Sequence, residues 1–593
     1  MSKEPKIVVG VDFGTTYSGL SYAYSAAPNP YDITVIKEWP IDQSVPTVGD
    51  LWKVPTEIAY RGAETPLWGY QIPPAMPRYT RFKLGLDADT PPTRFDHPGS
   101  QEALQLPPGK KPSDVCADFL RLLYQHLMNI LQDRLGAFLD LDTMPIHFNM
   151  TVPTNWSERA MALTKAAAKE AGLGSRTQDE LHMIKEPTAA ATWTLSYIER
   201  VYRPQHSMLN ENILVCDAGG GTVDLVTCTI NKLRPLVVSE AVANQGGKCG
   251  STSIDSDYLY FVRDQLNVRS SDQNALEIRR GSQLMVEFTS YKNTFGSPST
   301  PDRVSLRTGR GEEFVRLDRA QTTELFAPTL ERVRALIEQQ VRECANKRLK
   351  VHRILLVGGF GSSRYVEQNL RRWVNEAPLQ HMLGENLIIT QPPFAYITPW
   401  TATVQGAALH GIQSIVVTRV LDKHYGYVAS DFYDESVHAS WPAKDIYFSP
   451  FHGHKMAGNA IQWFATKGHR IDDDTEFTTK TFSYENADKL QLKLVTCLEE
   501  NPPQHVEHPS VQTLGHIELS LADAKIPDSE CEKIRVPGWW GTPLGSFNIY
   551  RIVFSVHAKM GNGELRFRTT TAAGTDITLT SSTRLVVDEQ IVW

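Results

Sequence analysis

Two short segments of the sequence combine an acidic residue with glycines and threonines in the same order. Asp12-Phe-Gly-Thr-Thr16 follows the apolar run Ile7–Val11, and Asp217-Ala-Gly-Gly-Gly-Thr222 follows the apolar run at 213–216. Another run with the composition of a strand comes directly after each segment. The order strand, acid, glycine and hydroxyl residues, strand therefore predicts a tight hairpin at each place.

Such a hairpin suits the binding of phosphate groups. Glycines let a ligand approach the backbone, consecutive N–H groups form a nest for anions, and threonine hydroxyls add further donors. An aspartate at the mouth of the hairpin can hold a hydrated Mg²⁺ beside the phosphates. One copy alone is better explained as an ordinary glycine turn with a capping aspartate. Because Asp217 repeats the pattern of Asp12 205 residues later, we expect two hairpins that grip a polyphosphate from both sides.

Two other nucleotide motifs are incomplete. Gly246-Gly-Lys-Cys249 resembles part of a P-loop, but a cysteine stands where the Ser or Thr is needed. The run Gly359-Phe-Gly-Ser-Ser-Arg364 lacks the third glycine of a dinucleotide-binding turn. These failures exclude a P-loop NTPase and a Rossmann enzyme.

The elements around the two segments alternate between strand and helix patterns as far as Ile415. Apolar runs predict strands at 146–152 and 354–357, and apolar residues at steps of three and four predict a helix from Val115 to Leu135 with Ser113 as its N-cap. A second helix is expected from Asn155 or Ser157 to Gly172. This alternation favours an α/β layered fold.

Helical periodicity fades after about Val420, where Thr-rich and β-branched runs such as 490–496 and 549–556 take over. We therefore expect three parts: an α/β domain over 1–413, an apolar connector over 414–421, and a mainly β domain over 422–593.

Composition narrows the function classes. The formal charge of −7 argues against nucleic-acid binding, and the mean hydropathy of −0.30, without an apolar run of about 18 residues, argues against a membrane protein. The seven cysteines are odd in number and include no C-x-x-C pair, and the amino-terminal residues do not resemble a signal peptide. We expect a cytoplasmic protein, with a nuclear location left open.

The chain resembles the DnaK-like, seventy-kilodalton heat-shock chaperones, as a divergent member of that family. The resemblance covers almost the whole length and rests on four motifs, which are the two Asp-Gly segments, Ile184-Lys-Glu-Pro-Thr-Ala-Ala-Ala191 and Leu355-Leu-Val-Gly-Gly-Phe-Gly-Ser-Ser-Arg364.

The resemblance implies an actin-like ATPase fold with duplicated ribonuclease-H-like lobes, followed by a β sandwich that binds polypeptides. No helical lid is expected after the sandwich. ATP or ADP with Mg²⁺, and a monovalent cation, are the implied cofactors. Polypeptide clients, J-domain proteins and nucleotide-exchange factors are the implied partners, without nucleic acid or membrane.

The resemblance also assigns site residues. The implied metal-binding residues are Asp12, Asp217 and Glu186. The implied catalytic residues are Lys83, Glu186, Asp217 and Asp224. The implied nucleotide contacts are Gly14, Thr15, Thr16, Tyr17, Gly219, Gly220, Gly221, Thr222, Gly246, Gly247, Lys292, Gly358, Gly359 and Arg364. Without the family, Lys83 would be read as an exposed lysine on a basic loop.

Three positions depart from the family pattern where the adenine base is held. The helix that carries Lys292 has Thr289 and Asn293 in place of a glutamate and an arginine, and Trp400 stands where the family has an aspartate. We therefore expect an intact triphosphate site with altered base recognition.

Three functions follow from these observations. The first is an ATP-hydrolysing chaperone-like protein whose nucleotide state regulates polypeptide binding. The second is a nucleotide-binding interaction protein with little turnover, which the altered base site motivates. The third is a small-metabolite kinase on the same fold, which shares the duplicated hairpins.

Overall fold

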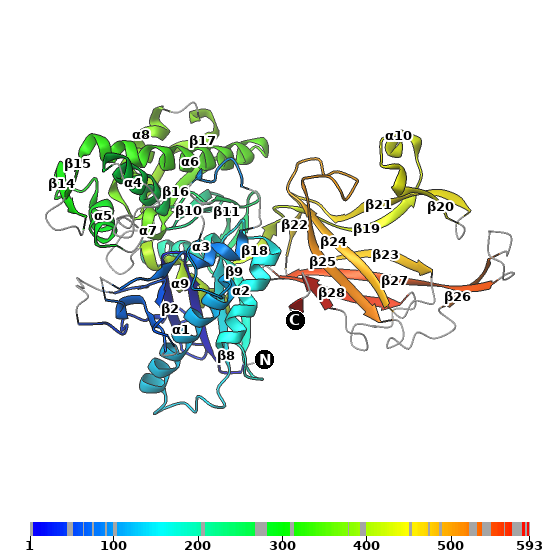
Figure 1. Cartoon of the computed structure of the whole chain (residues 1–593), viewed down its shortest axis with the longest axis horizontal. Coiled ribbons are helices and arrows are strands. Elements are labelled where there is room, and N and C mark those ends of the chain that lie inside the picture. The colour runs from blue at the N-terminus through cyan, green and yellow to red at the C-terminus, as the bar shows by residue number, and fades with distance from the viewer. Residues whose placement is uncertain are drawn as a thin grey trace. The chain divides into compact units, whose positions relative to one another are not determined.

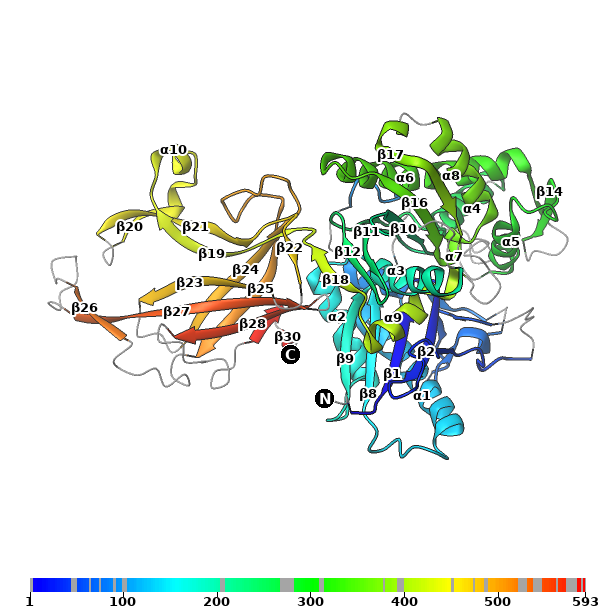
Figure 2. The same ribbon diagram turned by 180° about the vertical axis from the view of Figure 1, so that it is seen from behind.

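A computed structural model of the chain (Figures 1 and 2) divides into two compact units, residues 1–417 and 418–593. It describes residues 4–43, 51–62, 65–73, 76–88, 92–98, 104–202, 208–266, 282–308, 314–376, 379–391, 399–449, 453–472, 475–484, 489–520, 531–536, 547–561, 564–571, 584–587 and 590–591. Each unit is described separately below.

The first unit contains two mixed sheets with the same strand order. One sheet runs β3-β2-β1-β8-β9, with β4 beside β2. The other contains the equivalent order β12-β11-β10-β16-β17, with β13 beside β11, and continues beyond β12 through β18 (Val416–Val420). Their strands are β1 (Ile7–Phe13), β2 (Tyr17–Tyr24), β3 (Thr34–Val35), β4 (Val54–Pro55), β8 (Ile146–Val152), β9 (Glu180–Lys185), β10 (Asn212–Ala218), β11 (Val223–Leu233), β12 (Leu236–Glu240), β13 (Gln245–Gly247), β16 (Val351–Val357) and β17 (Leu383–Thr390).

The duplication extends to strand register. In the first sheet β1 is antiparallel to β2 and parallel to β8, and in the second β10 is antiparallel to β11 and parallel to β16. Asp12 pairs with Gly19 across the first hairpin, and Asp217 pairs with Asp224 across the second. The two Asp-Gly segments therefore occupy equivalent places in equivalent sheets.

Two helices lie between the sheets. α3 (Glu186–Tyr197) follows β9 of the first sheet but packs on β10 and β11 of the second, whereas α9 (Ala402–Ile412) packs on β1, β2 and β8 of the first. The two helices pack against each other at Gly406, where a Cβ atom would collide with the backbone of Ala189. The order of layers is therefore sheet, α9, α3, sheet (Figure 1).

The other face of each sheet packs against further helices. α1 (Pro112–Leu135) and α2 (Glu158–Ala171) share a core with β1, while α4 (Thr252–Gln265), α5 (Gln283–Thr294) and α6 (Arg319–Asn346) share a core with β10. Burial on both faces explains why β1 and β10 read as continuous apolar runs.

The helix boundaries follow local chemistry. As predicted, Ser157 caps α2 by accepting the N–H of Ala160, and Gly172 ends that helix with φ of 114°. The prediction that Ser113 caps α1 is wrong, because Pro112 already takes the first helical position. The Asp114 carboxylate then accepts the N–H of Lys111, the residue before the helix.

Smaller elements complete the first unit. They are β5 (Glu57–Ala59), β6 (Leu67–Trp68), η1 (Gly69–Gln71), β7 (Tyr79–Thr80), η2 (Phe82–Asp87), η4 (Ile198–Tyr202), β14 (Arg303–Arg307), β15 (Phe314–Asp318), α7 (Gly358–Gly361), α8 (Arg364–Glu376), η6 (Gln380–Met382) and η7 (Pro399–Thr401). β18 (Val416–Val420) crosses the boundary between the two units.

The second unit consists mainly of antiparallel strands in two sheets, ordered β20-β21-β19-β24-β25-β29-β30 and β23-β27-β26 with β28 beside β27. Ala558 of the second sheet joins Tyr427 and Leu494 of the first in one core. The elements are β19 (His424–Phe432), α10 (Glu435–His438), η8 (Ala443–Asp445), β20 (Ile446–Ser449), β21 (His454–Ala465), β22 (Arg470–Ile471), β23 (Glu476–Tyr484), β24 (Lys489–Cys497), β25 (Val511–Ser520), β26 (Cys531–Val536), β27 (Phe547–Gly561), β28 (Glu564–Thr571), β29 (Arg584–Val587) and β30 (Gln590–Ile591).

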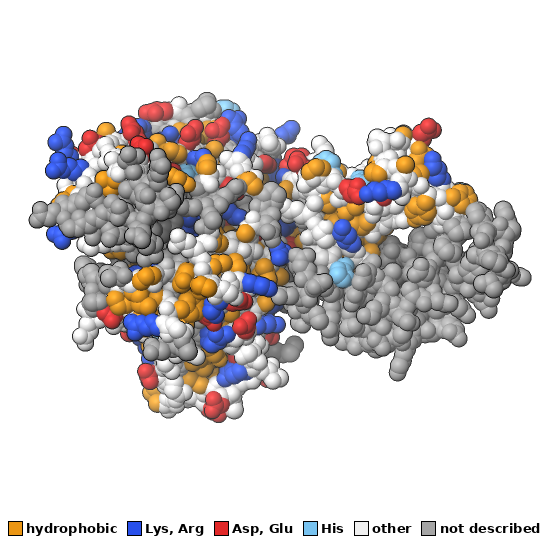
Figure 3. Space-filling model, viewed as in Figure 1, with side chains coloured by type: hydrophobic (Ala, Val, Ile, Leu, Met, Phe, Trp, Pro, Cys, Tyr) orange, Lys and Arg blue, Asp and Glu red, His pale blue; other side chains and the backbone are white. Residues whose placement is uncertain are grey.

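None of the helices that the structure describes has both the length and the apolar composition needed to cross a membrane. On the face of residues 1–417 drawn in Figure 3, acidic and basic side chains are interspersed.

Candidate functional site

The first hairpin is fixed by its neighbours in the sheet. Gly14, Thr15 and Thr16 connect β1 to β2, and β4 runs along the start of β2 on the other side. The N–H of Thr56 donates to the carbonyl of Thr16 over 2.8 Å, which fixes the end of the turn. Asp12 is thereby placed at the buried end of β1, two residues before Gly14.

The second hairpin is fixed through its carbonyl groups. The N–H of Gly219 donates to the carbonyl of Thr222 over 2.9 Å across the turn. The N–H groups of residues 250–252, at the start of α4, donate to the carbonyls of Gly219, Gly220 and Gly221 over 2.8 to 3.1 Å. A Cβ at Gly250 would collide with the carbonyl of Gly220, so this approach requires a glycine.

The two hairpins meet face to face. A Cβ atom at Gly220 would collide with the side chain of Thr16, and one at Gly221 would collide with the side chain of Thr15. The glycines of one hairpin therefore lie against the hydroxyl residues of the other.

Four carboxylates gather behind the hairpins. Asp12, Asp217 and Asp224 are almost fully buried, and Glu186 is brought to them at the first position of α3. Burial, together with the neighbouring Asp12, raises the pKa of Asp217 to about 7. Burial likewise raises the pKa of Glu186 to about 8, and Asp12, Asp217 and Asp224 all contribute to that rise. Asp12 and Asp217, which belong to different sheets, thus act on each other in one site.

Lys83 belongs to the same cluster. It lies in η2, is only 1% exposed, and places Nζ 2.9 Å from Glu186 Oε1. The rings of Phe13 and Trp156 lie 5.6 and 5.4 Å from the same ammonium. The alternative of an exposed lysine on a basic loop is therefore wrong. The sequence-predicted residues Lys83, Glu186, Asp217 and Asp224 are brought together, although they come from four different elements.

Lys53 is a second buried lysine in the cluster, and sequence reasoning missed it. Its Nζ lies 2.5 Å from Asp12 Oδ2, and both side chains are less than a tenth exposed. The side chain passes over Gly19, where a Cβ atom would lie only 3.2 Å from Lys53 Cγ. A lysine next to a short strand is usually exposed, so only the pairing of β4 with β2 reveals this contact.

Buried hydroxyl and amide groups orient the carboxylates. Thr403 Oγ1 donates to Asp217 Oδ2 over 2.8 Å from the start of α9, and Thr151 Oγ1 donates to Asp12 Oδ1 over 3.2 Å. The N–H of Thr154 donates to Asp224 Oδ1 over 2.6 Å. Sequence reasoning did not find these groups either, because a threonine near a strand or helix end carries no distinguishing signal.

The cluster suits a bound cation. Asp224 Oδ2 is buried and has no hydrogen-bond partner among the described residues. Four carboxylates share two lysines, and the pKa values of Asp217 and Glu186 are raised mainly by burial and further by the neighbouring carboxylates. Oxygen ligands of this kind are those that Mg²⁺ prefers.

The region expected to hold a nucleoside differs from the hairpins. Gly358, with φ of 82°, begins α7 and approaches the Asp217 carboxylate. The Trp400 ring packs edge-on against Tyr17 with ring centroids 5.0 Å apart, and a Cβ at Gly359 would lie 3.2 Å from Trp400 Nε1. An aromatic side chain therefore lies between the first hairpin and the Gly358–Gly359 turn.

The remaining sequence-predicted contacts fall into two groups. Gly246 pairs with Asp224, and Gly247 pairs with Val223, so both border the second hairpin. Lys292 is buried and donates to Asp255 Oδ1 over 2.6 Å.

Near Lys292 on α5, Thr289 is half-buried and Asn293 is exposed; Arg364, at the start of α8, is exposed too. None of these three side chains is therefore buried.

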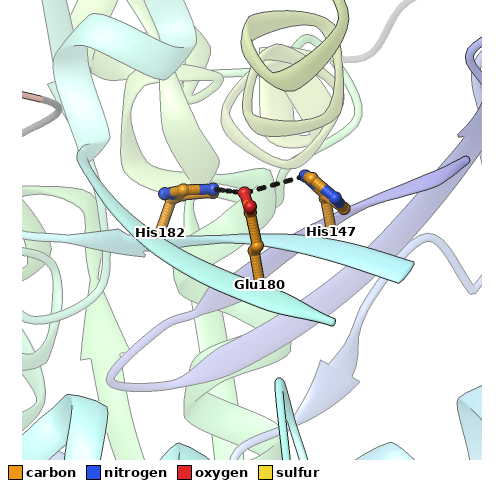
Figure 4. Close-up of side chains that lie close together, drawn as sticks. All are labelled: His147, Glu180 and His182. Carbon is orange, nitrogen blue, oxygen red and sulfur yellow. Dashed lines mark hydrogen bonds and ion pairs between the residues drawn. The ribbon is translucent and has the colours of Figure 1, made fainter. Parts of the chain in front are cut away.

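A separate cluster of His147, Glu180 and His182 lies on β8 and β9 (Figure 4). Glu180 Oε2 is 3.1 Å from His147 Nδ1 and 2.8 Å from His182 Nε2. Lys6 Nζ also lies 3.0 Å from His147 Nδ1, so an ammonium faces the nitrogen that a metal would need. His147 is in register with Val8, at the opposite end of β1 from Asp12. We treat this cluster as an ion-pair network apart from the hairpins.

Comparisons with known proteins agree with the motifs. The family model described as Hsp70 protein matches residues 124–389, which include Glu186 and the second hairpin. The chaperone protein DnaK of Thermoplasma volcanium is 28% identical over 283 residues, which cover 46% of this chain and 41% of that protein. A chaperone protein HscA homolog of Acinetobacter baumannii is 24% identical over 391 residues, which cover 63% of this chain and 55% of that protein. The chain thus spans about half the length of the curated relatives it matches.

Proposed function

Because the chain is a divergent member of the Hsp70 family, we propose that its residues 1–413 bind and hydrolyse ATP on an actin-like ATPase fold. One observation carries this proposal. Two equivalent glycine hairpins face each other, and a buried cluster of four carboxylates and two lysines lies directly behind them. This arrangement supplies donors for phosphate oxygens on one side and a place for a cation on the other.

The roles of the residues follow from their contacts. Backbone N–H groups and hydroxyls of Thr15, Thr16 and Thr222 bind phosphate oxygens. Lys83 offsets negative charge on the transferring phosphoryl group, and Glu186, to which it is paired, keeps the ammonium in position. Asp224 orients the attacking water with Thr222.

Asp12, Asp217 and Glu186 would hold Mg²⁺, largely through water, which neutralises charge on the phosphates. A monovalent cation would lie beside Asp224. The reaction is transfer of the γ-phosphoryl group to water, and catalysis comes mainly from positioning and from charge stabilisation.

Release of phosphate from ATP by the purified full chain tests the assignment. Lys83→Met should lower the rate about 100-fold, the range found when one charge-stabilising donor is removed from an active site. Asp217→Ala should lower it at least as much. Lys110→Met is the matched control, since Lys110 forms an ion pair with Asp118 outside the site. Unchanged turnover in both site variants would rule out the site as drawn.

We further propose that the nucleotide state regulates polypeptide binding by the β domain over 422–593, through the apolar connector over 414–421. Two antiparallel sheets with a shared core support this, since a sandwich edge can bind an extended peptide by main-chain hydrogen bonds. Clients, J-domain proteins and exchange factors would be the partners, and the cytoplasm the location. Polypeptide binding that is identical with ATP, with ADP and without nucleotide would contradict this part.

A second candidate function is nucleotide binding with little turnover. Trp400 beside Tyr17 and Gly359, and the engagement of Lys292 by Asp255, favour it because they alter the base site and not the hairpins. ATP would then act as a ligand that stabilises the folded unit by mass action. Thermal stabilisation by ATP, combined with phosphate release no faster than in the Lys83→Met variant, would support this candidate over the first.

A further inference from the structure

Lys53 contacts Asp12, one of the carboxylates proposed above to hold a metal ion. Its ammonium lies 2.5 Å from Asp12 Oδ2, while Asp12 Oδ1 accepts the Thr151 hydroxyl. Both oxygens of this carboxylate are therefore engaged by the protein itself. A divalent cation can reach Asp12 only by displacing the ammonium or by lying next to it, and like charges at short range in a buried site repel strongly.

The path of the side chain shows that the contact is built into the fold. Lys53 directly precedes β4, and its methylene groups cross β2 at Gly19. Gly19 is the residue that pairs with Asp12 across the hairpin. The equivalent position in the second hairpin carries Asp224. The second hairpin therefore has a carboxylate at the position where the first has a glycine that leaves room for the lysine side chain.

The ammonium also acts beyond Asp12. Burial is the main cause that raises the pKa of Asp217, and the charge of Lys53 opposes this rise. An ammonium has three N–H donors. One of them donates to Asp12, which leaves two that could donate to a phosphate oxygen. Unlike a threonine hydroxyl, the ammonium also brings a positive charge to that oxygen.

We infer that Lys53 is a resident cation of the polyphosphate site, which weakens the binding of divalent metal to Asp12 and lets a nucleoside polyphosphate bind with reduced dependence on that metal. This inference rests on the proposed function for its ligand, but the competition between ammonium and metal does not need a nucleotide.

Titration of the nucleotide-free full chain with Mn²⁺, followed by electron paramagnetic resonance, tests the competition. Lys53→Met and Lys53→Gln should bind Mn²⁺ at least 10-fold more tightly than the unsubstituted chain. Lys53→Gln keeps a hydrogen-bond donor to Asp12 and so guards against misfolding of the methionine variant. Lys110→Met, at an ion pair outside the site, should leave the affinity unchanged. Adding Asp12→Asn to Lys53→Met should remove the gain.

Equal Mn²⁺ affinity in the unsubstituted chain and both Lys53 variants would overturn the inference, as would the same gain in Lys110→Met. The nucleotide arm uses calorimetry with the non-hydrolysable analogue AMP-PNP, in Mg²⁺ and in EDTA. The dissociation constant in EDTA divided by that in Mg²⁺ should be about 10-fold larger for Lys53→Met than for the unsubstituted chain. An unchanged ratio would also overturn the inference. Failure of the unsubstituted chain to bind AMP-PNP in either buffer would instead overturn the proposed function, and the Mn²⁺ titration would still decide the role of Lys53.

Discussion

The four clustered acidic side chains of this chain differ in the groups that contact them. Asp12 and Glu186 each have a lysine partner within 3 Å, whereas Asp217 relies on the Thr403 hydroxyl and Asp224 on the N–H of Thr154. Burial is the first cause of the raised pKa of Asp217, Glu186 and Asp224 alike. The site therefore has a surplus of acid that a cation or proton must balance.

Thr403 is the residue whose role is simplest to isolate. Thr403→Val keeps the shape of the side chain but removes the hydroxyl that donates to Asp217. Because hydrogen bonds to charged groups contribute about 1.5 to 3 kcal/mol, we expect MgATP to bind at least about 10-fold more weakly by calorimetry. Thr192→Val is the control, since its buried hydroxyl donates to a carbonyl of its own helix. Equal losses in both variants would contradict a specific role for Thr403.

At the scale of elements, α3 and α9 connect the two sheets. α3 delivers Glu186 and α9 delivers Thr403, each at its first turn, and both helices are pressed together between the sheets. Gly10 on β1 and Gly406 on α9 permit this closeness, because a Cβ at either would collide with backbone atoms. Movement of one helix is therefore expected to move Glu186 and Thr403 together.

Gly406→Ala tests that packing. The added methyl group has no room against Ala189, so the helices must separate, and we expect the free energy of unfolding to fall by about 1 to 3 kcal/mol in denaturant titrations. Nucleotide affinity should fall as well, because Thr403 lies three residues away on the same helix. Gly361→Ala is the control, since a Cβ there would make only ordinary contacts at 3.5 Å. A Gly406→Ala protein as stable as the Gly361→Ala protein would show that the helices are not tightly packed.

Trp400 offers a prediction about the base. Its ring lies between Tyr17 and Gly359. Trp400→Asp introduces the aspartate that the resemblance to the heat-shock chaperones implies at this position. Because the ring is expected to alter base recognition, this variant should favour ATP over GTP several-fold more than the unsubstituted chain does. The measurement is a pair of calorimetric titrations. An unchanged ratio of the two affinities would place base selection elsewhere.

At the scale of the whole chain, the cysteines report on burial. Burial raises the pKa of Cys116, Cys216, Cys228 and Cys249, and raises that of Cys344 to about 11. These thiols stay protonated at pH 8, and only the thiolate reacts quickly with alkylating reagents. Mass spectrometry after brief iodoacetamide treatment should find them unmodified in the native protein and modified in urea. Fast native labelling of Cys249, which lies near the second hairpin, would contradict the described packing there.

Much of the fold could be predicted from local sequence because the residues of each hairpin themselves indicate its strands and its turn. The strands at 7–13 and 212–218 are fixed by apolar runs, and the turns by glycine. Lys53 and Thr403 could not be predicted, because their partners lie 41 and 186 residues away in the chain. Such contacts depend on which strands pair and which helix crosses which sheet. The position of Ser113 was misjudged for a local reason, since Pro112 starts the helix one residue earlier.

The proposed function requires that the two hairpins jointly bind a polyphosphate. Calorimetric titration of the metal-stripped full chain with ATP, ADP and GTP, with and without Mg²⁺, tests it most directly. We predict one site per chain for ATP, with binding lost in Gly220→Ala, whose Cβ would strike the Thr16 side chain, and retained in Gly458→Ala, whose Cβ would meet its nearest neighbour at an ordinary 3.4 Å. No heat of binding for any nucleotide in the unsubstituted chain, or equal binding by both variants, would contradict the claim.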